Sequence, residues 1–524
     1  MNFNNKKYAT IVLFILIILI GVFLRLYKLD RSLSGDEFFI IDIIRAANFS
    51  TAFTLILQDV HPPLYFLLEY FFLQCLVENE INIRILSVLF SVLALISNFV
   101  VLFIIHLKEK RTIHWLLGLF LIILSQPLIA FSQEARPYSL LYLCTSLLFL
   151  ALVVKYYYQR NSYSINLILS LFCTLTHYYG LFFVYAWAIS DILISLINSK
   201  PKVFFIQKLK LRLMVPPMVT AAVCSCLILG YFLLSFYVPD GLTSVLKNES
   251  VFSLIWSFPK WYVFNLVGHF YFNIKGTLPT RNLEIVDILN NKIIILPILT
   301  LAIFMLYKFI LIIKTLKSSP IHIVLIIYGF FPFILAYIAS FTGFLPYFRE
   351  KYLIGTILPF ILMFFYLTIR NKSSFDTIFA LLLLLLNLFA NYNYYFKANY
   401  IGRWENWKDA TRYLEKQVDP EKDIVVWYAY YSEPETHLYN YYANKILKHR
   451  SIYGQNSLSA DSLGFLANEA KVLKSTLFFV YYDNHRVLLD VDSKALDLLE
   501  KNYSFQNKSY FGPRLIIYKY LNYD

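Results

Sequence analysis

The 524-residue chain has few charged residues: Asp, Glu, Lys and Arg make up 15% of it, whereas 59% is hydrophobic. In soluble domains about a quarter of all residues are usually charged. So low a share excludes an ordinary soluble protein and indicates an integral membrane protein. The formal net charge of +14 does not point to nucleic acid, because the basic residues stand in short clusters between apolar runs and form no continuous stripe.

Cysteine and glycine are scarce as well. Only five cysteines occur and none lies beyond residue 397, so the C-terminal part requires no disulfide framework. Glycine accounts for 15 residues and no internal repeat is apparent, which argues against a transporter built from inverted repeats with glycine-broken helices. The first apolar segment lacks a small-x-small cleavage pattern, so we interpret it as a retained helix rather than a signal peptide.

Long apolar runs dominate what remains. A segment of about 20 residues crosses a hydrocarbon core of ~30 Å. By this measure the chain is a polytopic α-helical membrane protein with eleven spans. They are expected near residues 8–27, 82–107, 113–131, 138–156, 163–179, 181–198, 213–236, 293–313, 320–341, 353–369 and 375–392. The turn between the fifth and sixth spans, 177–180, must then be very tight.

The loop charges predict the orientation. With a cytoplasmic N-terminus, the inner loops contain Lys and Arg clusters near residues 108–111, 155–160, 200–212, 308–317 and 370–372. The opposite side has two long loops, 28–81 and 237–292. The first of them has eight acidic and three basic residues. The positive-inside rule therefore places the N-terminus in the cytoplasm and both long loops outside.

Two domains are expected: a membrane domain over residues 1–396 and a small extracytoplasmic α/β domain over 397–524. In the latter, helical patterning covers 404–417, 433–448 and 457–473, and short buried strands are predicted at 423–430, 476–482 and 514–520. In the first long loop, segments 38–47 and 64–76 are predicted as partly amphipathic helices on the membrane surface.

Two adjacent carboxylates, Asp36 and Glu37, follow the first span directly. One interpretation is that Asp36 caps the helix predicted to begin at Phe38, a common role for aspartate. The other is that an outward carboxylate at the membrane boundary is partly desolvated, so that its pKa rises and it serves as a general base. The two interpretations are compatible.

A second motif, Asp59-x-His61-Pro62-Pro63-Leu64-Tyr65, lies in the same loop. Pro62 keeps His61 out of the helical conformation, and a proline at a first helical position suits the helix that follows. His61 is either a structural hydrogen-bonding group or, because it shares a loop with Asp36, a substrate or phosphate contact.

Further polar residues end other spans on the outer side. They are Glu134, Arg136, Tyr138, His177, Arg349, Lys351 and Tyr352. Ionisable groups at span ends either anchor helices or gather in a site. Arg349 and Lys351 suit a phosphate through charge-assisted hydrogen bonds. His177 is either part of a packed polar turn or a member of the site.

These motifs resemble a known family when they are taken in chain order. They are Gly35-Asp36-Glu37, Asp59-x-His61-Pro62-Pro63-Leu64-Tyr65, Glu134-Ala135-Arg136-Pro137-Tyr138, Arg349-x-Lys351-Tyr352-Leu353 and Glu405-Asn406-Trp407-Lys408-Asp409-Ala410. The pattern is similar to that of bacterial glycosyltransferase family 39-like membrane enzymes of the GT-C superfamily. That group includes protein O-mannosyltransferases and lipid A aminoarabinose transferases.

The resemblance implies transfer of a monosaccharide, with inversion, from a polyprenyl-phosphate-linked donor to an acceptor hydroxyl on the extracytoplasmic face of the inner (plasma) membrane. It makes Asp36 the candidate base, with Glu37 beside it, and assigns Arg349 and Lys351 to the donor phosphate. The family more often has Arg-Tyr where this chain has Lys351-Tyr352. The remaining substrate-binding candidates, without fixed roles, are Asp59, His61, Glu134, Arg136, Tyr138, His177 and Tyr352.

The resemblance requires no cofactor, although some relatives bind a divalent ion, and the sequence assigns no metal ligands. It names neither the sugar nor the acceptor, which is a protein, a lipid or a glycan. The alternatives are a flippase or transporter of lipid-linked sugars and an oligosaccharyl transferase or polymerase. A saccharide-binding receptor would leave Asp36 unexplained. Ionisable groups at the outer span ends, rather than at mid-membrane, favour the enzyme.

Overall fold

The computed structural model describes residues 3–59, 61–109, 112–198, 206–235, 321–342, 348–366, 374–396, 406–419, 423–429, 452–455, 476–482, 503–511 and 515–522, with single residues at 261, 265–266, 268, 300, 303–304, 307, 310, 441–442 and 500. The chain divides into two compact units. The helical unit comprises Met1–Leu29, Asp42–Phe272 and Thr280–Tyr394, and the sheet unit comprises Asp30–Ile41, Asn273–Pro279 and Tyr395–Asp524. Residues 30–41, which include Asp36, thus group with the C-terminal residues.

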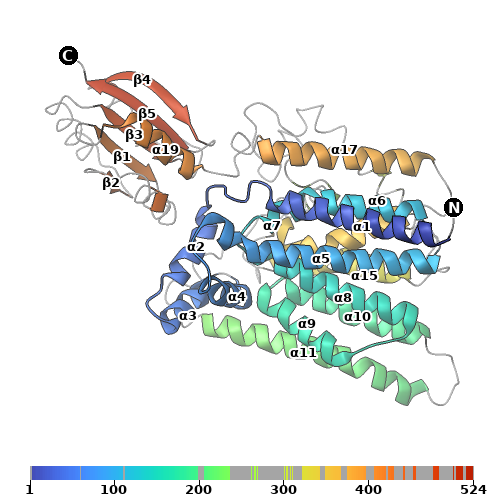
Figure 1. Ribbon diagram of the computed structural model, residues 1–524. Coiled ribbons are helices and arrows are strands. Elements are labelled where there is room, and N and C mark those ends of the chain that lie inside the picture. Colours follow the sequence, from blue (N-terminus) through green and yellow to red (C-terminus); the bar gives the residue numbers. More distant parts are fainter. Residues whose placement is uncertain are drawn as a thin grey trace. The chain divides into compact units, whose positions relative to one another are not determined.

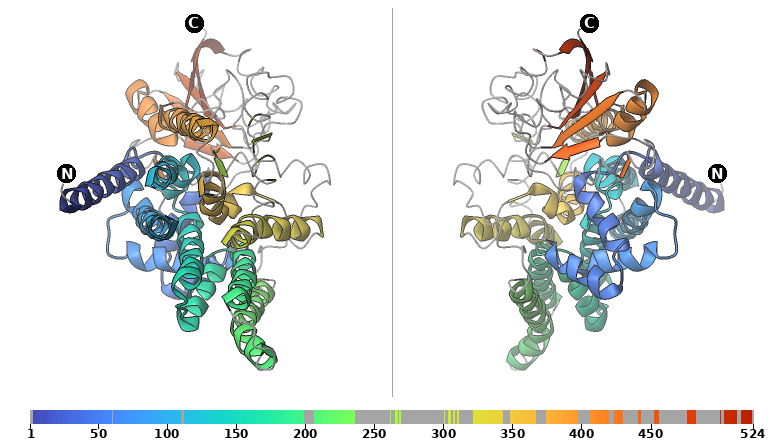
Figure 2. Two further views of the ribbon diagram at one scale, coloured as in Figure 1. Left: turned by 90° about the vertical axis from the view of Figure 1, so that its right-hand side faces the viewer. Right: turned by 90° about the vertical axis from the view of Figure 1, so that its left-hand side faces the viewer.

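Helices build the first unit. They are α1 (Phe3–Leu26), α3 (Phe49–Gln58), α4 (Leu64–Leu73), α5 (Glu80–Glu109), α6 (Thr112–Leu124), α7 (Gln126–Ser132), α8 (Tyr138–Tyr158), α9 (Tyr163–Thr176), α10 (Gly180–Asn198), α11 (Ile206–Ser235), α15 (Ile321–Phe341), the 3₁₀ helix η3 (Glu350–Thr356), α16 (Ile357–Tyr366) and nearly all of α17 (Ser374–Phe396). α5 lies between α1 and α8 and packs against both (Figure 1). α10 packs against α9, α11 and α15 (Figure 2).

Six segments of the described residues are long and apolar enough to cross a membrane. They are Glu80–Lys108, Tyr138–Tyr158, Gly180–Ile197, Met214–Tyr231, Ile321–Phe341 and Ile378–Phe396. The chain is therefore a multi-pass membrane protein by helix length and composition. Ten of the eleven predicted spans fall on a helix, but several of these helices are short or broken, and the eighth, 293–313, lies largely outside the described residues. The total of eleven remains a prediction.

The predicted third span is broken at Ser125 into α6 and α7. A break in a membrane helix frees backbone groups that need partners. Two side chains of α17 supply them. Nδ2 of Asn391 donates to the carbonyl oxygen of Leu124 at 2.7 Å, and Oδ1 of Asn387 accepts from the N–H of Gln126 at 3.2 Å. The break is thus satisfied by packing against α17.

Gln133 closes the C-terminal end of α1, a role that the sequence did not indicate. Its Nε2 atom lies 3.2, 2.9 and 2.8 Å from the carbonyl oxygens of Leu24, Arg25 and Tyr27. Its Oε1 atom accepts a hydrogen bond from the Tyr394 hydroxyl at 3.0 Å. The last carbonyls of a helix have no partner within it, so this one amide joins the end of α1 to α7 and α17.

The first long loop contains three helices where two were predicted. They are α2 (Gly35–Ile44), α3 and α4. α3 was not predicted, although its start has a local signal. Oδ1 of Asn48 accepts a hydrogen bond from the N–H of Thr51 at 2.9 Å. Asparagine is among the preferred residues at this capping position.

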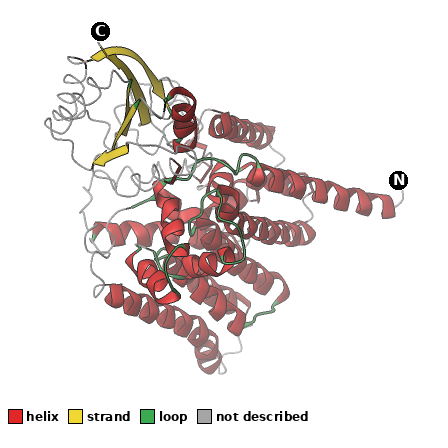
Figure 3. Ribbon diagram, turned by 60° about the vertical axis from the view of Figure 1, so that its left-hand side comes forward, coloured by secondary structure: helices red, strands yellow, loops and turns green. Residues whose placement is uncertain are grey.

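The sheet unit contains β1 (Ile424–Ala429), β2 (Ile452–Gln455), β3 (Leu477–Tyr482), β4 (Tyr503–Tyr510), β5 (Leu515–Asn522) and the helix α19 (Trp407–Gln417). The described strands form one sheet of order β2-β1-β3-β5-β4 (Figure 3). β1 is parallel to β2 and β3, whereas β5 is antiparallel to β3 and β4. The three predicted strands correspond to β1, β3 and β5. The predicted helices 433–448 and 457–473 lie almost wholly outside the described residues.

Candidate functional site

α2 begins at Gly35, and Glu37 supplies the glutamate half of a capping box by reaching back to Ser34. Oε2 of Glu37 accepts hydrogen bonds from the backbone N–H of Ser34 at 3.0 Å and from its Oγ at 3.2 Å. The N–H of Phe38 donates to the Ser34 carbonyl at 3.0 Å. Ser-x-x-Glu is the known signature of this cap. The interpretation that Asp36 caps a helix beginning at Phe38 is therefore wrong, because Asp36 lies inside the first turn.

The two adjacent carboxylates have opposite environments. Glu37 is fully buried, with 0% of its surface exposed, whereas Asp36 is exposed. The predicted desolvation thus falls on Glu37, where the capping hydrogen bonds compensate for it. An acidic residue in the first turn of a helix is stabilised by the helix dipole. Asp36 keeps that favourable position and also keeps its contact with solvent.

Seven predicted site residues come together in the helical unit. We call them the histidine cluster: Asp59, His61, Arg136, Tyr138, His177, Lys351 and Tyr352. They come from the α3–α4 connection, the α7–α8 connection and the start of α8, the α9–α10 turn, and η3. Four sequence segments that are far apart therefore converge at helix ends.

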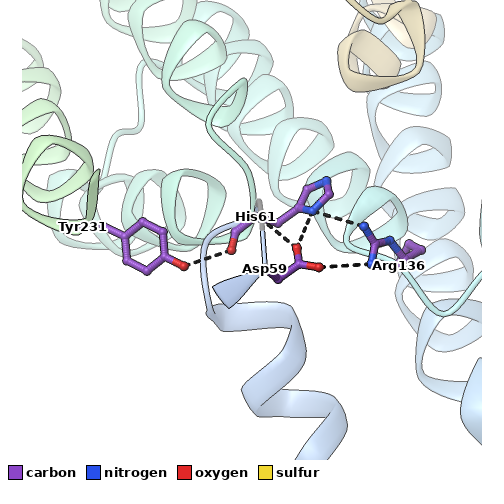
Figure 4. Close-up of polar contacts among 4 residues, drawn as sticks. All are labelled: Asp59, His61, Arg136 and Tyr231. Atoms are coloured by element: carbon purple, nitrogen blue, oxygen red, sulfur yellow. Dashed lines mark hydrogen bonds and ion pairs between the residues drawn. The ribbon is translucent and has the colours of Figure 1, made fainter. Parts of the chain in front are cut away.

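Asp59 orients His61 (Figure 4). Oδ1 of Asp59 lies 2.8 Å from the backbone nitrogen of His61 and 2.7 Å from its Nδ1. Because an ionised carboxylate only accepts, we assign the ring proton to Nδ1. Arg136 lies beside this pair, with Nη1 3.5 Å from Oδ2 of Asp59. Its Nη2 is 3.2 Å from Nδ1 of His61, a close approach without a hydrogen bond in this tautomer because both nitrogens carry protons. The Tyr231 hydroxyl donates to the His61 carbonyl at 3.1 Å, which fixes the loop from its other side.

The charges of this group follow from burial and pairing. Burial opposes ionisation of the Asp59 carboxyl, but the charge of Arg136 and the hydrogen bonds from His61 outweigh it and lower the pKa of Asp59 to about 2. Burial also lowers the pKa of His61; Asp59 counteracts this effect and Arg136 adds to it. At neutral pH, Asp59 is therefore negative, Arg136 is positive and His61 is neutral.

His177 presents a buried donor. Its Nδ1 accepts from the N–H of Tyr179 at 3.1 Å, so the ring proton resides on Nε2. Nε2 is buried and has no hydrogen-bond partner among the described residues. Burial, reinforced by His61 and Lys351, holds the pKa of His177 well below its usual range, and the ring is neutral. A buried donor without a partner costs about 1–3 kcal/mol, which a bound acceptor would offset.

His177 lies in the tight turn between α9 and α10 that the sequence predicted. α9 ends at Thr176, α10 begins at Gly180, and the N–H of Gly180 donates to the His177 carbonyl at 2.8 Å. A Cβ atom on Gly180 would lie 2.1 Å from the carbonyl oxygen of Cys173. Only glycine fits this approach, so the turn depends on it.

Lys351 lies against two tyrosine rings. Its Nζ is 4.8 Å from the ring centroid of Tyr138 and 5.4 Å from that of Tyr352, within the range of cation–π attraction. The Tyr352 ring also contacts those of His177 and His61, with centroids 4.4 and 6.1 Å apart. No acceptor for the Lys351 ammonium occurs among the hydrogen bonds and ion pairs of the described residues. The cation is thus held in place by rings while its hydrogen-bonding capacity remains.

Two further predicted site residues are Arg349 and Glu134. Arg349 is exposed, at the residue before η3. Glu134 is buried in the turn between α7 and α8, where its carbonyl oxygen accepts from the N–H of Arg136 at 2.8 Å. Within the described ranges, no three His, Cys, Asp or Glu side chains gather closely enough to hold a metal ion.

Comparison with known proteins gives a distant likeness. No protein-family model and no curated protein sequence matches the chain. Two crystal structures are similar, those of ArnT from Cupriavidus metallidurans in the apo state and bound to undecaprenyl phosphate, at 11% and 12% identity. Each comparison covers 98% of both chains with a TM-score of 0.46. At this identity and TM-score the likeness carries no argument about activity, which must come from the chain's own side chains.

Proposed function

We propose that this chain is a membrane glycosyltransferase that moves a monosaccharide from a polyprenyl-phosphate-linked donor to an acceptor hydroxyl on the extracytoplasmic face of the inner membrane. The observation that carries the proposal is the histidine cluster. It combines a fixed guanidinium, a ring-held ammonium and a buried imidazole N–H at the ends of apolar helices. These are the donors that bind a phosphate through charge-assisted hydrogen bonds.

The charge balance of the cluster favours one anionic group. Asp59 offsets Arg136 and both imidazoles are neutral, so Lys351 leaves the seven residues with one excess positive charge. Ionisable groups in membrane segments are costly and generally mark a functional site. In a protein with so many apolar helices, the phosphate of a membrane lipid is the anion that reaches such a place. Arg349, two residues before Lys351, is a second candidate cation for it.

In the proposed reaction Asp36 acts as the general base. It accepts the proton of the acceptor hydroxyl while the hydroxyl oxygen forms a bond to the anomeric carbon of the sugar. The bond between that carbon and the phosphate oxygen breaks, and its electron pair leaves with the phosphate. A single displacement of this kind inverts the anomeric configuration. No step uses a metal ion.

The cluster acts on the leaving group. Lys351 and Arg136 stabilise the negative charge that develops on the phosphate, and the His177 N–H donates to one of its oxygens. Donors held in place before the reaction are among the largest contributions to catalysis. Glu37 already has a structural role in the capping box, so the base is assigned to Asp36 alone.

Mass spectrometry of lipid-linked sugars and envelope glycans in cells tests this proposal. Three strains are compared: one with the wild-type chain, one with Asp36→Asn and one without the chain. We expect the variant and the deletion to lose the same glycan modification and to accumulate the same polyprenyl-phosphate sugar, which identifies the donor. Full modification in the Asp36→Asn strain would contradict the proposal. Accumulation of the donor on the cytoplasmic face would support a flippase instead.

A further inference from the structure

The sheet unit holds the backbone just before Asp36. The hydroxyl oxygen of Tyr442 accepts a hydrogen bond from the backbone N–H of Leu33 at 2.9 Å. Leu33 is 0% exposed and Tyr442 is 2% exposed. A buried N–H that lacks an acceptor costs about as much as a lost hydrogen bond. Leu33 directly precedes the capping box, so this bond fixes the point at which the chain enters α2.

A second contact holds the backbone just after Asp36. The rings of Phe38 and Tyr441 meet edge to face, with centroids 5.7 Å apart and an interplanar angle of 75°. Both side chains are buried. Aromatic pairs in this geometry stabilise a fold beyond the effect of their buried area. At the start of the same segment, Nζ of Lys408 donates to the Asp30 carbonyl at 2.9 Å.

The segment between these contacts has little freedom left. The capping box joins Ser34 to Glu37, and Leu33, Glu37 and Phe38 are buried on either side of Asp36. Asp36 alone among the acidic residues of this turn is exposed. The arrangement thus fixes the backbone of Asp36, while the residue itself remains exposed.

We propose that Tyr442 is a positioning residue for Asp36, and that one function of the C-terminal part of the chain is to hold the catalytic turn. The inference rests on the proposed role of Asp36. Small displacements of a catalytic group cost rate, with losses of about a hundredfold for a shift near 1 Å. A residue that positions the base through the backbone affects turnover rather than affinity for the donor, so we expect the loss of the Tyr442 hydroxyl to change kcat and not KM.

The test compares Tyr442→Phe with the matched control Tyr520→Phe. Each substitution removes one hydroxyl from a buried ring of the sheet unit, but the Tyr520 hydroxyl has no hydrogen-bond partner within the described residues. Two readouts are needed: hydrogen exchange of the peptide covering residues 30–41, and the kinetics of sugar transfer from the donor that accumulates in the deletion strain.

For Tyr442→Phe we expect the Leu33 amide to exchange about fivefold faster or more, because a hydrogen bond worth about 1 kcal/mol is lost. We also expect kcat to fall at least about tenfold, with an unchanged KM for the lipid donor. Tyr520→Phe should match the wild type in both measurements. Together these results support the inference.

Three results would overturn it. Unchanged exchange in Tyr442→Phe would show that the bond does not hold the segment. Faster exchange with an unchanged kcat would show that the bond does not position the base. A higher KM with an unchanged kcat would assign Tyr442 to binding. If Asp36→Asn retains full transfer, the proposed function of Asp36 fails and the positioning role fails with it, whereas the exchange result still reports the contact itself.

Discussion

Oδ1 of Asp59 accepts from both the backbone N–H and the ring Nδ1 of His61, at 2.8 and 2.7 Å. One carboxylate oxygen therefore fixes the ring of its neighbour and leaves the second oxygen for Arg136. A histidine oriented in this way presents its other nitrogen, Nε2, as an acceptor. The Asp-x-His spacing is short enough for a single loop to set this geometry.

Replacement of Asp59 by asparagine should destabilise the folded chain at neutral pH. The folded-state pKa of about 2 lies below the ordinary value of 3.8, so the carboxylate stabilises the fold above about pH 4. This shift corresponds to roughly 2 kcal/mol. The contribution is lost as the pH falls from about 4 to 2. Melting temperatures of the two proteins in detergent should differ at pH 7 and converge in that acid range; equal values at pH 7 would contradict the assignment.

Loss of the His177 donor should weaken binding of the proposed polyprenyl-phosphate lipid by about tenfold or more, the value of one hydrogen bond to a charged group. His177→Phe removes the N–H, whereas His177→Gln retains an N–H donor and should bind nearly as well as the wild type. The lowered pKa keeps His177 neutral, so binding should gain nothing from its protonation between pH 8 and 6. A rise in affinity near pH 6.5 that His177→Phe abolishes would show a charged imidazole.

Removal of the Lys351 charge should also weaken binding of the lipid phosphate. Lys351→Met keeps an apolar side chain against the Tyr138 and Tyr352 rings but loses the ammonium. We expect its affinity for the lipid phosphate to be tenfold to hundredfold weaker, where each tenfold corresponds to about 1.4 kcal/mol of binding free energy. Lys351→Arg should retain most of the binding. Because the lost attraction is electrostatic, the affinity of Lys351→Met should also depend less on salt. Equal affinities of wild type and Lys351→Met would remove Lys351 from the site.

A methyl group on Gly180 should disrupt the turn that carries His177. The added Cβ would lie 2.1 Å from a carbonyl oxygen of α9, so the backbone must move. We expect Gly180→Ala to lower stability by about 2 kcal/mol or more and to reduce lipid-phosphate binding. Gly230→Ala in α11 is the matched control, since nothing lies within 4 Å of its added Cβ. Thermal unfolding measures both, and similar melting temperatures would contradict the steric argument.

Local signals in the sequence predicted much of this architecture. The tight turn at residues 177–180 and the motifs that place His61, Arg136 and Lys351 at helix ends are confirmed because each depends on a few consecutive residues. The Ser34-x-x-Glu37 pattern was also a local signature. It was overlooked, and the cap was therefore wrongly assigned to Asp36. Tyr231, Gln133 and Tyr442 were missed for a different reason: their partners lie about 100 or more residues away and leave no local pattern.

The sheet also shows where prediction from local sequence fails. The predicted strands β1, β3 and β5 occupy its interior and contain buried apolar side chains. The two missed strands, β2 and β4, are its edges. β2 has four residues, and β4 is mainly polar and exposed. An edge strand is defined by pairing along one side only, so its sequence carries a weak signal.

Transfer rates of Asp36→Asn and Glu37→Gln test the central claim most directly. Both variants remove one negative charge from adjacent positions of the same turn. Glutamine still closes a capping box, so Glu37→Gln should retain most of the activity. The transfer rate of Asp36→Asn should fall about a hundredfold or more, the usual contribution of a general base, with unchanged binding of the proposed polyprenyl-phosphate lipid and an unchanged melting temperature. Transfer by Asp36→Asn within a few fold of the wild type would contradict the account.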